Sequence, residues 1–258
     1  MTIYRTGGSI GKNNSPTASI ATGMWTMDEV ELAARASLWP QQIVTSGLVL
    51  LLDAGIPHSY PGSGITWTDL SGVGNNGTLV SGPTYSSSNG GTIVFDGVDD
   101  YVSGSMTALI TNVSLNCWVN IATTSKMGTF VKIGGGTAGF SIGVGTDNTT
   151  ILGNDVIGLF PGIRFIDTNV SYGTGWKYVT MILSATSVPS IYLNGTLVGS
   201  YAGASPIAAT NLFYVGSNIG DGVRAYGGNI SHVAVYNRVI TQTEITQNFN
   251  ALRNRYGV

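Results

Sequence analysis

Carboxylates are the side chains of this 258-residue chain with the most obvious potential for chemistry. Glycosidases need two of them, roughly 5 to 10 Å apart, on either side of the scissile bond. The three glutamates, Glu29, Glu31 and Glu244, all lie in segments with helical patterns near the two ends of the chain, and the strand-rich part between them has none. We therefore predict that the protein is not an enzyme.

Other nucleophiles and bases are equally sparse. The two histidines are His58, in a loop with Pro, Gly and Ser neighbours, and His232, in a predicted strand. The single cysteine, Cys117, lies in the strand-like run LNCWV, where a buried structural thiol is expected. No Ser-His-Asp or Cys-His spacing stands out, so neither nucleophilic catalysis nor a zinc site is predicted.

Hard oxygen ligands are more plentiful, and calcium is the metal that prefers them. The segment 69–76 is rich in carboxylate, amide and hydroxyl oxygens. The candidate calcium ligands are Asp53, Asp69, Asn75 and Asp99. The alternative is that such groups bind their own backbone in Asx turns, and the run DGVDD at 96–100 is interpreted first in that way. Both alternatives stay open, so no cofactor is certain.

Sugar binding would need aromatic rings in loops, because the apolar faces of sugars stack on them. Three loop tyrosines are the candidates for glycan contact: Tyr60, Tyr172 and Tyr226. A host-surface polysaccharide is the partner that such contacts would recognise.

The candidate residues lie in and between short runs of β-branched and aromatic residues, which predict the strands that position them. From Gly47 onward the runs alternate with clusters of Gly, Asn, Asp and Ser, which is the pattern of a β-sandwich. Asn194-Gly195 is the strongest hairpin signal in the chain. Thr241 and Glu244 form a capping box that predicts a C-terminal helix over about 242–255. Residues 47–258 are thus predicted to be one β-sandwich with a terminal helix.

Residues 1–46 are predicted to form an N-terminal arm that serves docking or assembly. Its first part has no periodicity, and a capping box at Thr26 predicts a short helix over about 27–38. A helix of this length needs a partner surface for its apolar side chains. The predicted docking residues are Trp25, Met27, Leu32, Leu38 and Trp39. Because the residues after Met1 lack an apolar core, export by a signal peptide is not expected.

The charge balance argues against nucleic acid as a partner, and the length of the apolar runs argues against a membrane. Eleven basic and 13 acidic residues give a net charge of −2, and no basic cluster is present to neutralise phosphates. The longest aliphatic run, 48–52, is far shorter than the roughly 20 residues that cross a bilayer. We expect neither nucleic acid nor a membrane as a partner.

Four motifs together resemble the laminin G-like, concanavalin A-like lectin domains. They are Trp67–Leu79, Ile93–Val102, Ile191–Gly199 and Gly228–Arg238. Their order and spacing match that family over about residues 47–255. The resemblance implies an all-β fold, a jelly-roll sandwich of two antiparallel sheets, to which the arm and the C-terminal helix are added.

The opening of this region, Gly47–Gly55 followed by Ser59–Gly64, looks like the variant of the domain carried by tailed-bacteriophage virion proteins. This resemblance implies a non-enzymatic structural protein of the virion, assembled in the host cytoplasm. Its role would be capsid decoration or cement, with the arm bound to a major capsid or tail protein and to other copies of the chain. The alternative is a carbohydrate-binding adhesion module of a tail or fibre that recognises host surface glycans.

Overall fold

The computed structural model describes residues 42–107, 112–122, 128–135, 139–144, 156–161, 166–184, 189–200, 211–218 and 224–258. Their contacts divide the chain into two compact units. One unit is Thr45–Thr246, and the other combines Met1–Val44 with Gln247–Val258. The predicted arm helix over 27–38 lies outside the described residues, as do the docking candidates Trp25, Met27, Leu32, Leu38 and Trp39.

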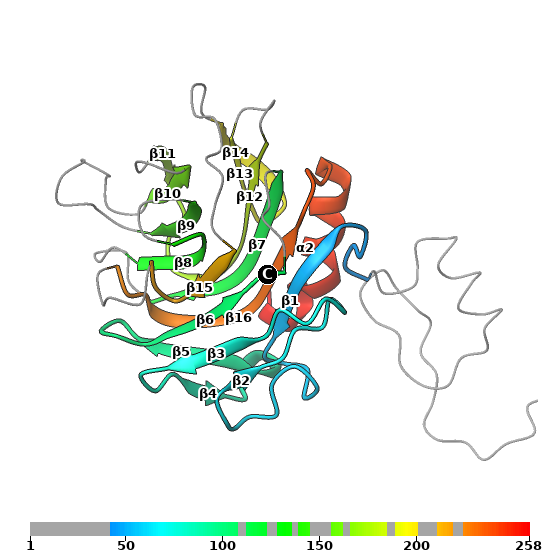
Figure 1. Cartoon of the computed structure of the whole chain (residues 1–258). Helices are drawn as coiled ribbons and strands as arrows, with labels where there is room; N and C mark the ends of the chain where they lie inside the picture. Colours follow the sequence, from blue (N-terminus) through cyan, green and yellow to red (C-terminus); the bar gives the residue numbers. More distant parts are fainter. Residues whose placement is uncertain are drawn as a thin grey trace, which may run out of the picture. The chain divides into compact units, whose positions relative to one another are not determined.

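The unit Thr45–Thr246 is built on two β-sheets (Figure 1). The first sheet has the order β14-β13-β12-β7-β16-β5-β4, and β1 also pairs with β16. Its strands are β1 (Leu48–Asp53), β4 (Thr84–Ser86), β5 (Thr92–Asp96), β7 (Val113–Ile121), β12 (Gly175–Leu183), β13 (Ser190–Leu193), β14 (Thr196–Ser200) and β16 (Gly227–Tyr236).

The second sheet has the order β11-β10-β9-β8-β15-β6-β3-β2. Its strands are β2 (Thr66–Trp67), β3 (Gly77–Val80), β6 (Tyr101–Ser105), β8 (Gly128–Ile133), β9 (Phe140–Val144), β10 (Val156–Pro161), β11 (Ile166–Ser171) and β15 (Leu212–Val215). All the strand pairings described in the two sheets are antiparallel. A 3₁₀ turn, η1 (Ser88–Gly90), and a helix, α2 (Gln242–Tyr256), complete the described elements. The predicted all-β jelly-roll sandwich is confirmed.

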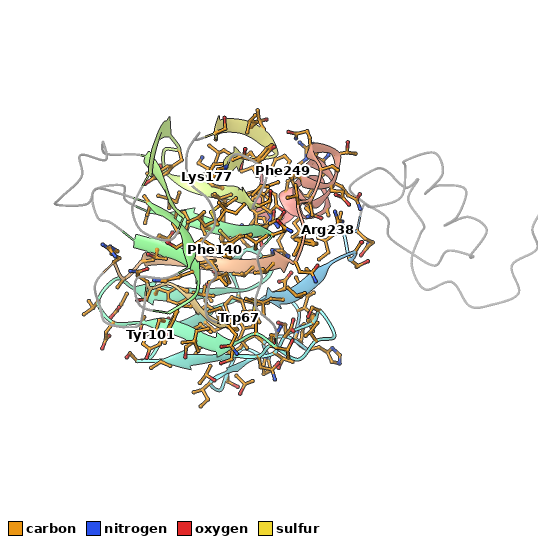
Figure 2. The ribbon with its side chains drawn as sticks, turned by 45° about the horizontal axis from the view of Figure 1, so that its top comes forward. Trp67, Tyr101, Phe140, Lys177, Arg238 and Phe249 are labelled. Carbon is orange, nitrogen blue, oxygen red and sulfur yellow. The ribbon has the colours of Figure 1, made fainter. Side chains whose placement is uncertain are left out.

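Apolar side chains at every second position of the central strands form the core between the two sheets. In β7, every second residue from Val113 to Ile121 belongs to the core cluster, and Cys117 is among them. In β12 the core residues are Val179, Met181 and Leu183. Burial raises the pKa of the Cys117 thiol, so this sulfur stays a neutral core group. Figure 2 shows the side chains of the fold, with the buried rings of Trp67 and Phe140 labelled.

The sequence-predicted hairpin is confirmed at Asn194-Gly195, which joins β13 to β14. Asn194 has φ of 51° and Gly195 has φ of 82°, as the turn between two twisted strands requires. The Asn194 side-chain oxygen also accepts a hydrogen bond of 2.9 Å from the backbone N–H of Tyr178. This contact fixes the turn to the neighbouring strand β12.

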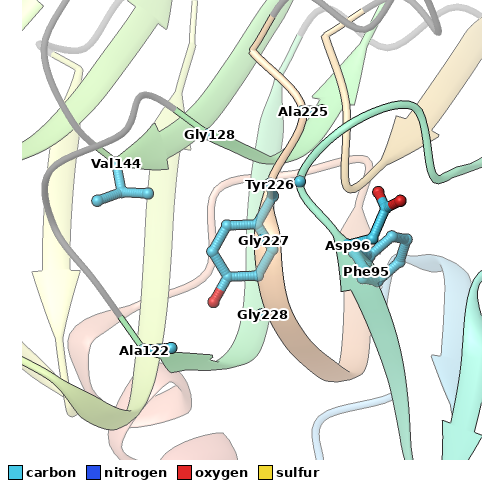
Figure 3. A pocket seen from close by; sticks show the side chains of 10 residues that line it. Phe95, Asp96, Ala122, Gly128, Val144, Ala225, Tyr226, Gly227 and Gly228 are labelled. Atoms are coloured by element: carbon cyan, nitrogen blue, oxygen red, sulfur yellow. The ribbon is translucent and has the colours of Figure 1, made fainter.

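One end of the sandwich brings strands of both sheets together. The end of β5, the residue after β7 and the start of β16 lie beside the start of β8 and the end of β9 (Figure 3). Loops and strand ends at such a position can present a binding surface on a rigid frame.

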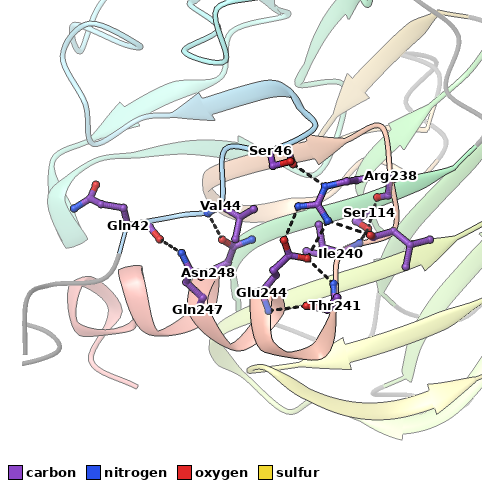
Figure 4. A network of polar contacts seen from close by, with 11 residues as sticks. Gln42, Val44, Ser46, Ser114, Arg238, Ile240, Thr241, Glu244, Gln247 and Asn248 are labelled. Carbon is purple, nitrogen blue, oxygen red and sulfur yellow. Dashed lines mark hydrogen bonds and ion pairs between the residues drawn. The ribbon is translucent and has the colours of Figure 1, made fainter. Parts of the chain in front are cut away.

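The helix α2 begins with the predicted capping box. The Thr241 backbone N–H donates to Glu244 Oε2 at 2.8 Å, and the Glu244 N–H donates to Thr241 Oγ1 at 3.3 Å. In the unit that contains residues 247–258, the Val44 N–H donates to Asn248 Oδ1 at 2.7 Å (Figure 4). Within the described ranges, no helix combines the length and hydrophobicity that a bilayer crossing requires.

Arg238 ties the end of β16 to the first turn of α2. Its guanidinium forms two hydrogen bonds with the Glu244 carboxylate, at 2.9 and 2.6 Å, and Nε donates to the Ser46 carbonyl at 2.9 Å (Figure 4). This two-point geometry is the strong form of an arginine–carboxylate pair. The hydrogen bonds from Arg238 are the largest cause that lowers the pKa of Glu244 to about 2.

We expect the Glu244 pair to contribute stability that acid removes. The folded-state pKa of Glu244 is depressed, so the contribution is complete above the ordinary value of 4.5 and is lost as the pH falls towards 2. Because the pair is partly exposed, its contribution is about 1 kcal/mol. Urea unfolding at pH 6 and pH 2.5 measures it as the extra acid loss of the wild type over Glu244→Gln. Equal acid losses in the two proteins would contradict the prediction.

Candidate functional site

Asp69 organises the loop that the sequence offered as a calcium site. Its Oδ1 accepts hydrogen bonds from the backbone N–H groups of Leu51 and Ser71, at 2.8 and 2.9 Å. Its Oδ2 accepts from Ser71 Oγ at 2.7 Å, from the Gly74 N–H at 3.1 Å and from the Asn75 N–H at 2.9 Å. Five donors surround the carboxylate, so it serves as a turn-capping group of the Asx type.

Asn75 is used in the same way. Its amide nitrogen donates to the Val49 carbonyl at 2.7 Å, and its amide oxygen accepts from the Thr107 N–H at 2.9 Å. Asp53, the third candidate, accepts a hydrogen bond from the Gly55 N–H at 2.8 Å. Asp69, through its carboxylate, and Asn75, through its amide nitrogen, hold their loop to β1, which is a structural use.

Asp99 belongs to an acidic cluster with Asp96 and Asp100, and the calcium set of Asp53, Asp69, Asn75 and Asp99 stays a prediction. Among the residues that the structure describes, the group of three acids that could hold a cation is Asp96, Asp99 and Asp100, whose carboxylate oxygens lie within 4.8 Å of one another. The sequence could not separate the two sets, because strand pairing decides which turns become neighbours.

The β5–β6 turn carries this acidic cluster. Asp96 Oδ1 accepts from the Val98 N–H at 2.7 Å, and Asp100 Oδ2 accepts from the Asp96 N–H at 3.0 Å. Gly97 has φ of 77°, which suits the bend. Burial raises the pKa of Asp100, and the nearby charges of Asp96 and Asp99 raise it further. Asp96 and Asp99 are exposed.

None of the three glycan-contact candidates offers an exposed ring. Tyr60 is 4% exposed, donates its hydroxyl to the Gly64 carbonyl at 2.8 Å and lies 5.7 Å from the Tyr85 ring. Tyr172 is 3% exposed. Both rings pack inward and join the hydrophobic core cluster, so sugar stacking on them stays a prediction that their burial does not favour.

The third candidate, Tyr226, lines a cavity of about 300 Å³ at the end of the sandwich shown in Figure 3. Strand ends of both sheets contribute to the walls of this cavity, and most of its lining is small or apolar. The lining residues are Phe95, Asp96, Gly97, Ala122, Gly128, Val144, Ala225, Tyr226, Gly227 and Gly228. This is the candidate functional site, and we name it the strand-end cavity.

Tyr226 is held rigidly in the wall of the strand-end cavity. It is 1% exposed, its hydroxyl donates to the Asn120 carbonyl at 2.7 Å, and its ring meets Phe130 edge to face at 5.0 Å. Burial is the first cause that raises the pKa of its hydroxyl, so the group stays neutral. The ring is therefore a rigid and buried part of the cavity wall.

Glycine permits the close packing around that ring. A Cβ on Gly228 would lie 2.6 Å from the Tyr226 hydroxyl oxygen, and a Cβ on Gly128 would lie 3.0 Å from the Tyr226 side chain. Gly227 differs, because a Cβ there would meet its nearest atom, the Cα of Gly97, at an ordinary 3.4 Å. Sequence reasoning missed these cavity residues, although Gly227-Gly228 at the start of a strand was an available signal.

The chemistry of the strand-end cavity suits binding. Asp96 is the one carboxylate among its described lining residues, and a carboxylate accepts hydrogen bonds from hydroxyl groups. Phe95, Val144 and Ala225 supply apolar surface. The described lining contains no second carboxylate, so the paired acid and base of a glycosidase do not meet there.

Comparisons with solved structures identify the fold. The chain superposes on domain 4 of AbnA, an extracellular arabinanase from Geobacillus stearothermophilus in complex with arabinotriose, with a TM-score of 0.60 at 16% identity, covering 79% of this chain and 98% of that domain. It superposes on the receptor-binding domain of botulinum neurotoxin type G with a TM-score of 0.57 at 16% identity, covering 79% of this chain and 51% of that one.

A third match is the binding domain of botulinum neurotoxin DC in complex with SialylT, with a TM-score of 0.61 at 14% identity, covering 81% of this chain and 52% of that one. The chain thus spans about half the length of the neurotoxin domains that it matches. No curated protein sequence matches the chain. A family model does match, over residues 95–246, which is more than half of the sequence. The chain belongs to this laminin G-like family of the concanavalin A-like lectin/glucanases superfamily.

Proposed function

We propose that this protein is a carbohydrate-binding module without catalytic activity, and that the strand-end cavity is its glycan site. The observation that carries the proposal is the composition of that cavity, in which an exposed carboxylate, Asp96, stands beside a fixed tyrosine ring and a glycine-lined wall. Sugars offer hydroxyl donors along their edges and apolar C–H groups on their faces. The cavity has a partner for each.

The volume of the strand-end cavity also supports its assignment as a glycan site. Ligand sites have volumes of roughly 300 to 1,000 Å³, and the cavity of about 300 Å³ is at the lower limit. A site of this size suits one or two sugar rings at the end of a chain. The glycines at 227 and 228 keep the backbone of β16 accessible on one side of it.

The fold relatives support a binding role over a hydrolytic one. One of them, domain 4 of an arabinanase, was solved in complex with arabinotriose, and another, a neurotoxin binding domain, in complex with SialylT. The glutamates that a glucanase would use are missing from residues 45–243 of this chain.

The substitution Ala122→Trp tests the proposal. Ala122 is exposed and lines the strand-end cavity, so an indole there will obstruct it without disturbing the core. We expect glycan affinity, measured on a glycan array and by calorimetry with the best ligand, to fall about tenfold or more. The matched control is Leu197→Trp, which places the same ring on β14 at a position that is 51% exposed and outside the cavity lining.

Equal loss of binding in the two variants, or no loss in either, would refute the cavity as the glycan site. An array that is blank with the wild-type chain would refute the proposed function itself.

The location and partners of this module stay as the sequence predicts them. A place in a virion, through residues 1–46 bound to a capsid or tail protein and to other copies of the chain, is a proposal that rests on the resemblance of Gly47–Gly64 and on the apolar side chains of the arm. A tail or fibre module that recognises host glycans agrees best with a strand-end glycan site.

A further inference from the structure

We infer that the strand-end cavity selects uncharged glycans and rejects sugars that carry a carboxylate, such as uronic and sialic acids. The inference rests on the proposed function and names the ligand class of that site. Its observations are the negative charges at the rim of the cavity and the hydrogen-bonding capacity of Asp96.

Three carboxylates create a local negative field beside the cavity. Asp96 is itself a lining residue, and its oxygens lie within 4.8 Å of those of Asp99 and Asp100. Asp96 and Asp99 are exposed, so the field extends into the solvent from which a ligand arrives. Like charges a few ångströms apart repel one another, and the effect reaches about 8 Å at physiological salt.

Positive charge does not balance this field within the described lining. Asp96 is the only charged side chain among the residues that the structure places in the cavity wall, and Arg224, two residues before Tyr226, is not one of them. An incoming sugar carboxylate would therefore meet repulsion, and none of the lining residues that the structure describes is an arginine or lysine that could bind it.

The hydrogen-bonding capacity of Asp96 is a second reason why the cavity would prefer neutral sugars to acidic ones. An ionised carboxylate such as that of Asp96 only accepts hydrogen bonds. A sugar hydroxyl supplies the proton that it needs, whereas the carboxylate of an acidic sugar is another acceptor. A neutral ring thus satisfies Asp96, and an acidic group at the same place leaves two acceptors facing each other.

Paired oligosaccharides that differ in one functional group test the inference. We would immobilise glucose- and galactose-terminated oligosaccharides beside their glucuronate- and galacturonate-terminated counterparts, and lactose beside sialyllactose. The 258-residue chain would be applied in a buffer with a chelator. We expect neutral members to bind about tenfold or more tightly than their acidic partners at low salt, and the ratio to shrink as salt is added.

Two substitutions at Asp99 separate charge from shape. Asp99 is exposed and lies outside the cavity lining. Asp99→Asn removes one charge, and we expect it to reduce the neutral-to-acidic affinity ratio about threefold. Asp99→Glu keeps the charge and should keep the ratio.

The outcomes distinguish the inferred selection against acidic sugars from the proposed glycan-binding function. Acidic sugars bound as tightly as neutral ones, or a ratio that Asp99→Asn leaves unchanged, would overturn the charge selection while the glycan-binding function stands. Neither class bound by the wild-type chain would overturn the function and the inference together.

Discussion

Replacing Asp69 with alanine will lower the free energy of unfolding by about 3 to 4 kcal/mol. The carboxylate is buried and accepts hydrogen bonds from four backbone N–H groups and the Ser71 hydroxyl. Alanine leaves these donors without their acceptor. Each unsatisfied buried donor costs about 1 kcal/mol or more, reduced where water enters the loop. Urea unfolding monitored by tryptophan fluorescence will measure the loss.

Asp99→Ala is the matched control, since it removes an exposed aspartate from another turn, and we expect a change of about 0.5 kcal/mol or less. A chelator provides a second readout. If Asp69 held calcium, adding EDTA would destabilise the wild type and leave Asp69→Ala unaffected. An Asp69→Ala protein within about 1 kcal/mol of the wild type would show that the hydrogen bonds do not stabilise the loop.

Gly228→Ala will destabilise the protein by about 3 kcal/mol and weaken glycan binding at the strand-end cavity. Gly228 has φ of 153°, and its added Cβ would lie 2.6 Å from the Tyr226 hydroxyl oxygen and 2.9 Å from the Asn120 carbonyl oxygen. These two atoms are joined by the hydrogen bond that holds the Tyr226 ring. The methyl group must therefore displace either the ring or the strand β7.

The neighbouring substitution Gly227→Ala is the control for this prediction. Its Cβ meets ordinary contacts only, so we expect a change of about 1 kcal/mol or less. Thermal unfolding of both variants, with glycan titrations at a temperature where both are folded, measures the difference. Equal melting temperatures for the two variants would contradict the tight packing of Tyr226 against Gly228.

Local signals in the sequence were sufficient for several elements. The hairpin at Asn194-Gly195 follows from two residues that accept positive φ. The start of α2 follows from Thr241 and Glu244, whose reciprocal hydrogen bonds lie within four residues of chain. The core residues of β12, which are Val179, Met181 and Leu183, alternate along the strand because successive side chains point to opposite faces.

Candidate ligands and glycan contacts were harder to predict, because residue type does not reveal what a polar atom or a ring contacts. Asp69 and Asp99 are the same amino acid in similar turns, yet one is enclosed by five donors and the other is exposed. Tyr60 and Tyr226 are both buried loop tyrosines, and Tyr226 lines the strand-end cavity whereas Tyr60 does not. Burial and partners depend on which segments the sheets bring together.

The sequence by itself determined the β-sandwich class and the terminal helix, since these depend on periodicity, local turn chemistry and composition, while the antiparallel jelly roll was implied by the resemblance of four motifs to a known family. Only the tertiary structure decided where a ligand can bind. The strand-end cavity joins residues from 95 to 228, contributed by five strands or their ends, and its walls meet through long-range pairing of β16 with β5 and β7. Such a site has no local signature, because its geometry arises when distant glycines allow two sheets to approach each other.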